Sequence, residues 1–178
     1  YGSIPKDETF VGVKGAKEAM YNDGNRKPQG LTLHPITVDL WEHEHWPRGG
    51  EEINIIEAGK NYGWPKITYG ENYSGTLITK NRSLPGMEQP FYYWVPSIAT
   101  SGMAFITSNK YPEWKGSLLV GSLKKTYLER LTIRNNNVIA REKIADGIGR
   151  VRDVIIGPNG YIHIAVEFEG IYRLKPNK

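Results

Sequence analysis

Two arginines separated by one residue, Arg150 and Arg152, are the first feature of this sequence with the potential to bind a ligand. In an extended strand, side chains two positions apart point to the same face, so both guanidiniums can meet one ligand. Guanidiniums bind anionic oxygens through parallel N–H donors, which favours a ligand with several negative charges. A surface pair held by salt bridges is the alternative. Arg26 and Lys124 are two further cations expected at strand ends.

A second candidate is the segment 46–65, WPRGGEEINIIEAGKNYGWP, which is rich in carboxylates, amides and glycines. Calcium takes about six to eight oxygen ligands from carboxylates, backbone carbonyls and water. Glu51, Glu52 and Asn54 offer such oxygens, but their spacing is not that of an EF-hand. A solvated acidic turn is therefore the alternative interpretation.

The other residues with catalytic potential form no recognised set. The four histidines, His34, His43, His45 and His163, lack metal-ligand spacing, and a packed or hydrogen-bonded role is expected for each. The sequence contains no nucleophile elbow, phosphate loop or dinucleotide fingerprint, and it has no cysteine. Trp94 matters for function only if its ring lies over a flat ligand; otherwise it packs in the core or at a rim.

Short strands are expected to position these residues, because apolar and polar residues alternate in short runs bounded by glycine and proline. The predicted strands lie within 31–35, 39–45, 102–106, 117–123, 127–133, 154–156, 161–166 and 170–174. Turns are predicted at Asn135-Asn136-Asn137 and Pro158-Asn159-Gly160, since Asn and Gly tolerate positive φ. Segment 14–21, KGAKEAMY, is the one candidate helix, with one or two turns at most.

Three passages repeat the order strand, turn, strand, and they open at Gly30, at Gly102 and near Arg152. These starts are 72 and about 50 residues apart. Repeats of roughly 40–50 residues with three or four strands are typical of β-propeller blades. A single β-sandwich is the alternative. The regular unit length and the long excursion between 46 and 90 favour an all-β propeller.

The composition excludes some classes of function. Net charge is +4 with a pI of about 9.1, but Lys and Arg are scattered among 19 acids, which argues against a nucleic-acid partner. No apolar run approaches the roughly 20 residues that span a bilayer, and the first residues do not resemble a signal peptide.

Five motifs together resemble a known family, and they occur in its order. They are NRKPQGL (25–31), LWEHEHWPRGGEEINII (40–56), GKNYGWP (59–65), GSLLVGSLK (116–124) and GRVRDVIIGPNGYIHIAV (149–166). The family is that of soluble aldose sugar dehydrogenases dependent on pyrroloquinoline quinone (PQQ), the glucose/sorbosone dehydrogenase group of six-bladed β-propellers. The resemblance covers nearly all of the chain. It implies about three blades of a quinoprotein propeller, in one partial domain over 1–178.

The resemblance also implies a cofactor site and two calcium sites. The residues matching the PQQ site are Arg26, Trp94, Ser97, Lys124, Arg150 and Arg152. On this pattern the cations neutralise the cofactor, with Lys124 on the quinone side, while Trp94 covers the cofactor plane and Ser97 supplies a nearby hydroxyl. The carbonyls of Trp46 and Pro47 match ligands of the cofactor's Ca²⁺. Glu52 and the carbonyl of Tyr62 match a second, structural Ca²⁺ site.

Three positions depart from the family pattern: Lys27 replaces Asn, Trp46 replaces Gly and Glu51 replaces Asp. Glycine is often needed where backbone approaches a ligand closely, so Trp46 is expected to bring bulk into the space for PQQ. The family's catalytic His lies in its N-terminal half. The chain is therefore expected to match the C-terminal half, without the general base.

The expected ligand is an aldose sugar or another small molecule. The expected partner is either the missing N-terminal half or a second copy in a homodimer, because three blades leave two open sides. The alternative to a dehydrogenase half is a non-catalytic half-propeller module for binding or assembly. By resemblance, the location would be periplasmic or secreted.

Overall fold

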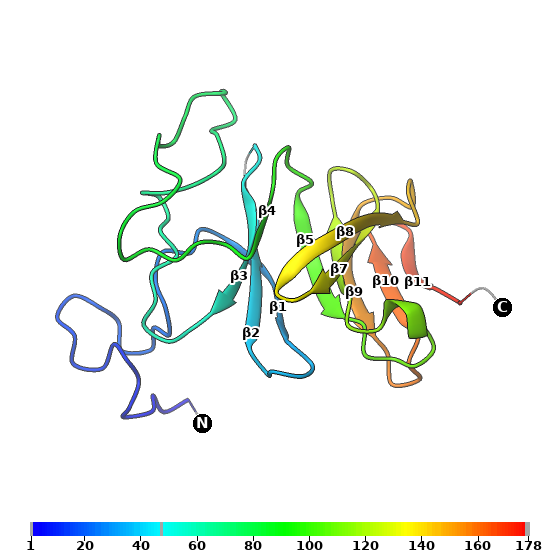
Figure 1. Ribbon diagram of the computed structural model, residues 1–178, viewed down its shortest axis with the longest axis horizontal. Helices are drawn as coiled ribbons and strands as arrows, with labels where there is room; N and C mark the ends of the chain where they lie inside the picture. Colours follow the sequence, from blue (N-terminus) through cyan, green and yellow to red (C-terminus); the bar gives the residue numbers. More distant parts are fainter. Residues whose placement is uncertain (1, 47, 177–178) are drawn as a thin grey trace.

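The computed structural model describes residues 2–46 and 48–176, which form three antiparallel sheets (Figure 1). The first sheet has the order β1-β2-β3-β4, the second β5-β6-β7-β8 and the third β11-β10-β9. No helix in these two ranges is long and apolar enough to cross a membrane.

The first sheet comprises β1 (Pro28–Leu33), β2 (Leu40–Glu44), β3 (Glu51–Ile56) and β4 (Tyr92–Trp94). Between β3 and β4 the chain makes a long excursion, residues 57–91, which has isolated β-bridges in place of strands. One of these bridges joins Asp23 to Asn61, so the excursion is tied to the segment before β1.

The second sheet comprises β5 (Thr100–Phe105), β6 (Leu118–Ser122), β7 (Leu128–Arg134) and β8 (Asn137–Ile144), with a short 3₁₀ helix, η1 (Pro112–Trp114), between β5 and β6. The third sheet comprises β9 (Val151–Ile156), β10 (Ile162–Val166) and β11 (Gly170–Arg173). Consecutive strands pair in each sheet, so every sheet is an antiparallel meander.

The first strand of each sheet is its innermost one, because β1 contacts β5 and β5 contacts β9. The three sheets thus lie side by side around these strands, as blades of a partial ring (Figure 1). Glycine permits the close approach of the inner strands: a Cβ at Gly102 of β5 would lie 2.0 Å from the Asp153 Oδ1 atom on β9.

Two hydrophobic cores hold neighbouring sheets together. The core between the first and second sheets is built on residues such as Trp41, Ile53 and Leu131, and the core between the second and third on residues such as Leu128 and Ile164. Apolar residues at alternate strand positions supply both cores, as half-buried strands require.

The prediction of an all-β propeller of the quinoprotein type is confirmed, with three blades radiating from inner strands rather than two layers of a sandwich. Asn135 and Asn136 adopt positive φ, 49° and 56°, in the β7–β8 turn, as predicted. The candidate helix in 14–21 is wrong: Gly15 has a φ of 87°, and the segment forms hydrogen-bonded turns.

Candidate functional site

One end of the partial ring collects the predicted cofactor residues. Because strands alternate in direction, loops 45–50, 95–99, 123–127 and 145–150 and the turn 167–169 all emerge at the same end, which we call the upper end (top of Figure 1). Arg26 precedes β1 at this end, and six further predicted site residues lie in these loops or at the strand ends beside them. These residues are Trp46, Trp94, Ser97, Lys124, Arg150 and Arg152.

Hydrogen bonds join the upper loops of neighbouring sheets. The backbone N–H groups of Leu123 and Lys124 donate to the carbonyls of Ala99 and Ile98, at 2.9 and 3.2 Å. Arg150 Nη1 lies 3.4 Å from the Leu123 carbonyl, so the third sheet reaches the same loop. The Lys124 side chain is exposed and forms no salt bridge within 2–46 and 48–176. Its ammonium is therefore available to an anion.

Arg150 and Arg152 share one carboxylate, that of Glu167. Arg150 donates from Nε to Glu167 Oε2, and Arg152 donates from Nη2 to Glu167 Oε1 at 2.7 Å. Hydrogen bonds from Arg152 and Arg150 lower the pKa of Glu167. Half of each arginine side chain stays exposed. The arginines are thus salt-bridged to Glu167, as the alternative interpretation expected, and both also reach solvent.

Arg26 lies against two indoles that contact each other. Its guanidinium carbon is 4.9 Å from the ring centroid of Trp46 and 5.5 Å from that of Trp64, and Nη1 donates to the His45 carbonyl at 2.7 Å. The Trp46 ring is buried, with its centroid 4.4 Å from that of Trp64. Trp46 is therefore directed toward the excursion that contains Trp64. Pro47 lies outside the described residues.

The side chains of Trp94 and Ser97 are buried and form hydrogen bonds inside the protein. Trp94 is only 1% exposed, packs in the first core, and donates from Nε1 to Glu129 Oε2 at 2.6 Å. No face of its ring is open, so Trp94 cannot cover a flat ligand in this arrangement. Ser97 is buried as well and donates to Glu51 Oε1. Glu51 is fully buried, and burial raises its pKa.

Glu52 belongs to a group of buried carboxylates that we call the acidic cluster: Glu42, Glu44 and Glu52. Their positions on the paired strands β2 and β3 place them on one face of the first sheet, turned away from Trp41 and the first core. Asn25 donates to Glu42 at 3.0 Å and to Glu44 at 3.3 Å, which ties the cluster to the segment before β1.

Burial dominates the electrostatics of the acidic cluster. Desolvation, with the neighbouring Glu44 charge second, raises the pKa of Glu42 to about 9 and that of Glu52 to about 8. Desolvation also raises the pKa of Glu44. Glu42 Oε1 is buried and has no hydrogen-bond partner among the residues that the structure describes. Buried carboxylates with raised pKa values either keep a proton or bind a cation.

The donors available for calcium are hard oxygens of the kind the ion prefers. Within the two described ranges, however, no three His, Asp or Glu side chains form a group that could hold a metal by themselves. Carbonyls and water would have to complete such a site. Tyr62 is buried, and its hydroxyl donates to the Ile55 carbonyl at 2.7 Å and accepts from the Glu57 N–H at 2.9 Å. Its backbone carbonyl is the oxygen predicted to bind calcium.

Sequence reasoning missed Glu42, Glu44 and Glu167. The first two carried a usable signal: two acids at alternate positions of a strand beside a core residue, Trp41, must share one face. Glu167 carried none, because its partners are 15 and 17 residues away on another strand.

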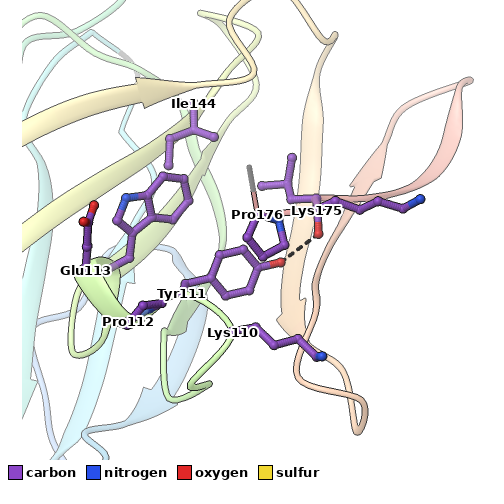
Figure 2. Close-up of a pocket in the computed structure, with 9 residues that line it drawn as sticks. Lys110, Tyr111, Pro112, Glu113, Ile144, Lys175 and Pro176 are labelled. Atoms are coloured by element: carbon purple, nitrogen blue, oxygen red, sulfur yellow. Dashed lines mark hydrogen bonds between the residues drawn. The ribbon is translucent and has the colours of Figure 1, made fainter. Parts of the chain in front are cut away.

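A cavity of about 660 Å³ is separate from the upper loops (Figure 2). It opens between the β5–β6 loop and the segment after β11, where the Tyr111 hydroxyl donates to the Leu174 carbonyl at 2.7 Å. None of the predicted site residues lines it. Its lining residues are Lys110, Tyr111, Pro112, Glu113, Trp114, Ile144, Leu174, Lys175 and Pro176.

A partial ring of antiparallel blades with basic residues at one end defines a partial β-propeller of the quinoprotein type. The sequence pattern of the Glucose / Sorbosone dehydrogenase family matches residues 1–173, and the chain belongs to that family. The family is PQQ-dependent.

Known proteins similar to this chain include enzymes of sugar oxidation. The aldose sugar dehydrogenase YliI of Escherichia coli (strain K12) is 43% identical over 169 residues, which are 93% of this chain and 46% of YliI. A crystal structure of a glucose dehydrogenase matches with a TM-score of 0.92 at 43% identity, over 99% of this chain and 52% of that one.

The PQQ-bound aldose sugar dehydrogenase of Streptomyces coelicolor has a TM-score of 0.69 at 22% identity, over 97% of this chain and 48% of that one. This last likeness concerns the fold alone. The chain spans about half the length of the relatives it matches.

Proposed function

We propose that this chain supplies the cofactor-binding end of a PQQ- and calcium-dependent aldose sugar dehydrogenase, which oxidises the C1 hydroxyl of a sugar to a lactone. The observation that carries the proposal is the convergence of Lys124, Arg150 and Arg152 on the upper end, from two neighbouring blades. Family membership supports the reaction class.

The upper end suits a flat tricarboxylate. Lys124 is exposed and forms no salt bridge with the described part of the chain, and Arg150 and Arg152 have half-exposed side chains, so three cations can meet several carboxylates. The Trp46 ring is buried and packs against Trp64 and the Arg26 guanidinium. When bound, PQQ supplies the quinone that accepts hydride from the sugar. Trp94 is left out of this proposal because its ring is buried.

Calcium is proposed at the acidic cluster, with Glu52 and the carbonyl of Tyr62 as ligands and Glu42 beside them. The raised pKa values and the unpartnered Glu42 Oε1 support a cation there, since a cation would stabilise the ionised carboxylates. A second calcium ion, held by the carbonyls of Trp46 and Pro47, would lie beside the cofactor.

The general base is not assigned to this chain. Its four histidines do not match the family's base motif. His34 and His163 lie away from the upper loops, and His43 is completely buried in β2. His45 lies at the upper end with Nδ1 3.1 Å from the Thr100 carbonyl. We propose that the base comes from the part of the ring that this chain does not contain.

A thermal-shift titration with PQQ and CaCl₂ tests the proposal. Ligand at about 100 times its dissociation constant stabilises a protein by roughly 2.7 kcal/mol. Lys124→Met should abolish most of the shift. Lys110→Met, which removes an exposed lysine on the β5–β6 loop, should keep it. An absent shift in the wild-type chain, or an equal shift in Lys124→Met, contradicts the proposal.

The edge of β11 favours a second candidate function, that of a binding or assembly module. Sheets one and two have four strands, whereas within the described residues β11 pairs only with β10, and Ile171 on it is exposed. An unpaired strand edge can accept another strand. Two copies, or this chain with a matching half-propeller, would then close a ring. A monomeric mass at micromolar concentration would contradict pairing between copies.

A further inference from the structure

We propose that Glu167 is a positioning residue that holds Arg150 and Arg152 side by side as one binding site for the carboxylates of the cofactor. This inference rests on the proposed function, because it takes PQQ as the ligand of the two arginines. It assigns a role to a residue in the turn between β10 and β11.

The backbone fixes where Glu167 lies. Its N–H donates to the Arg150 carbonyl at 2.9 Å, so the turn is fastened to the start of β9. The next residue, Phe168, has a φ of 64°, which lets the chain reverse in three residues before β11 begins. Glu167 therefore sits directly beside the two arginines, and only 18% of its side chain is exposed.

Glu167 contacts each guanidinium in a way that leaves donors free. It takes Nε of Arg150 and one terminal nitrogen of Arg152, whereas each guanidinium carries five N–H donors. Nη1 of Arg150 lies toward the Leu123 carbonyl, next to Lys124. The terminal edge of Arg150 is thus directed to the loop with the free lysine, and Glu167 does not occupy that edge.

The two arginines need such a residue because their charges repel. Both reach the carboxylate of Glu167, Arg152 from β9 and Arg150 from the residue before it, and two like charges at this distance separate when nothing joins them. One carboxylate with an oxygen for each guanidinium keeps them together, and the trio retains a net charge of +1. Fixed, paired donors bind a carboxylate ligand with less loss of entropy than two mobile side chains.

Glu169 provides a matched control in the same turn. It has the same charge, is exposed, and forms no salt bridge among the residues that the structure describes. Glu167→Gln and Glu169→Gln therefore change the net charge equally, but only the first breaks the contact with the arginines. Glu167→Asp keeps the charge on a shorter side chain.

Quenching of tryptophan fluorescence by PQQ, in excess CaCl₂, measures the dissociation constant of each variant. We expect Glu167→Gln to weaken binding by about tenfold or more, the scale of a lost hydrogen bond to a charged group. Glu169→Gln should bind as the wild type does, and Glu167→Asp should recover part of the loss. Melting curves without PQQ should be similar for Glu167→Gln and Glu169→Gln, which separates positioning from folding.

Two results would contradict the inference, and they do so in different ways. If the wild type binds PQQ and Glu167→Gln binds as tightly or more tightly, Glu167 is a neutral or competing anion and the inference is wrong. If the wild type does not bind PQQ at all, the proposed function itself fails, and this inference fails with it.

Discussion

Glu42→Gln should stabilise the metal-free protein at neutral pH and have little effect in acid. Glu42 has a pKa of about 9 in the fold, because of burial and the neighbouring Glu44, whereas the usual pKa of a glutamate is 4.5. Between these values the folded state holds a proton that the unfolded state has lost, so stability falls as pH rises. At a pH of about 7.5 the cost is up to roughly 4 kcal/mol, from about three pH units at 1.36 kcal/mol each. Gln needs no proton and escapes this cost.

Urea unfolding in EDTA, near pH 4.5 and near pH 7.5, measures the effect. The stability gap between Glu42→Gln and wild type should widen toward neutral pH, and Glu57→Gln, an exposed position just after β3, should show no such widening. Calcium should narrow the gap, because a cation stabilises the ionised cluster of the wild type. A gap that is the same at both pH values would refute the assignment of Glu42 as a protonated buried acid.

Three further outcomes are expected. Trp46→Gly should lower stability by about 3–5 kcal/mol, because a buried indole packed on Trp64 is lost; PQQ affinity should not rise, and a rise would show that the indole blocks the site. Trp94→Phe should lower the free energy of unfolding by about 1–3 kcal/mol, because buried Glu129 loses a donor; an unchanged urea midpoint would argue against this bond. Burial lowers the pKa of His43 to about 4, below the usual 6.5, so its contribution is present above pH 6.5 and lost as pH falls through 4. His43→Gln should remove that acid-dependent loss in urea titrations, and an unaltered pH profile would contradict it.

Much of the fold was predictable because the signals are local. Alternation of apolar and polar residues indicated the strands, and Asn135 and Asn136 indicated a turn with positive φ, which they adopt. The gathering of Lys124 and Arg150 at one end follows from the alternating direction of short antiparallel strands.

The contacts of the site were less predictable because they join segments far apart in the chain. The acidic cluster depends on the segment before β1, through Asn25, and on the irregular excursion after β3. Trp94 was expected either over a ligand or in the core. Its hydrogen-bond partner Glu129 lies 35 residues away in the chain, and this long-range hydrogen bond holds the Trp94 ring in the core. Sequence spacing gives side-chain direction within a strand but not the residue that lies opposite on another blade.

Equilibrium dialysis with PQQ, read by its absorbance in the presence of calcium, tests the central claim most directly. The account predicts saturable binding of one PQQ per chain, lost in Arg150→Gln/Arg152→Gln and kept in Lys110→Met. No saturable binding by the wild type, or full binding by the double variant, would contradict a cofactor site at the upper end.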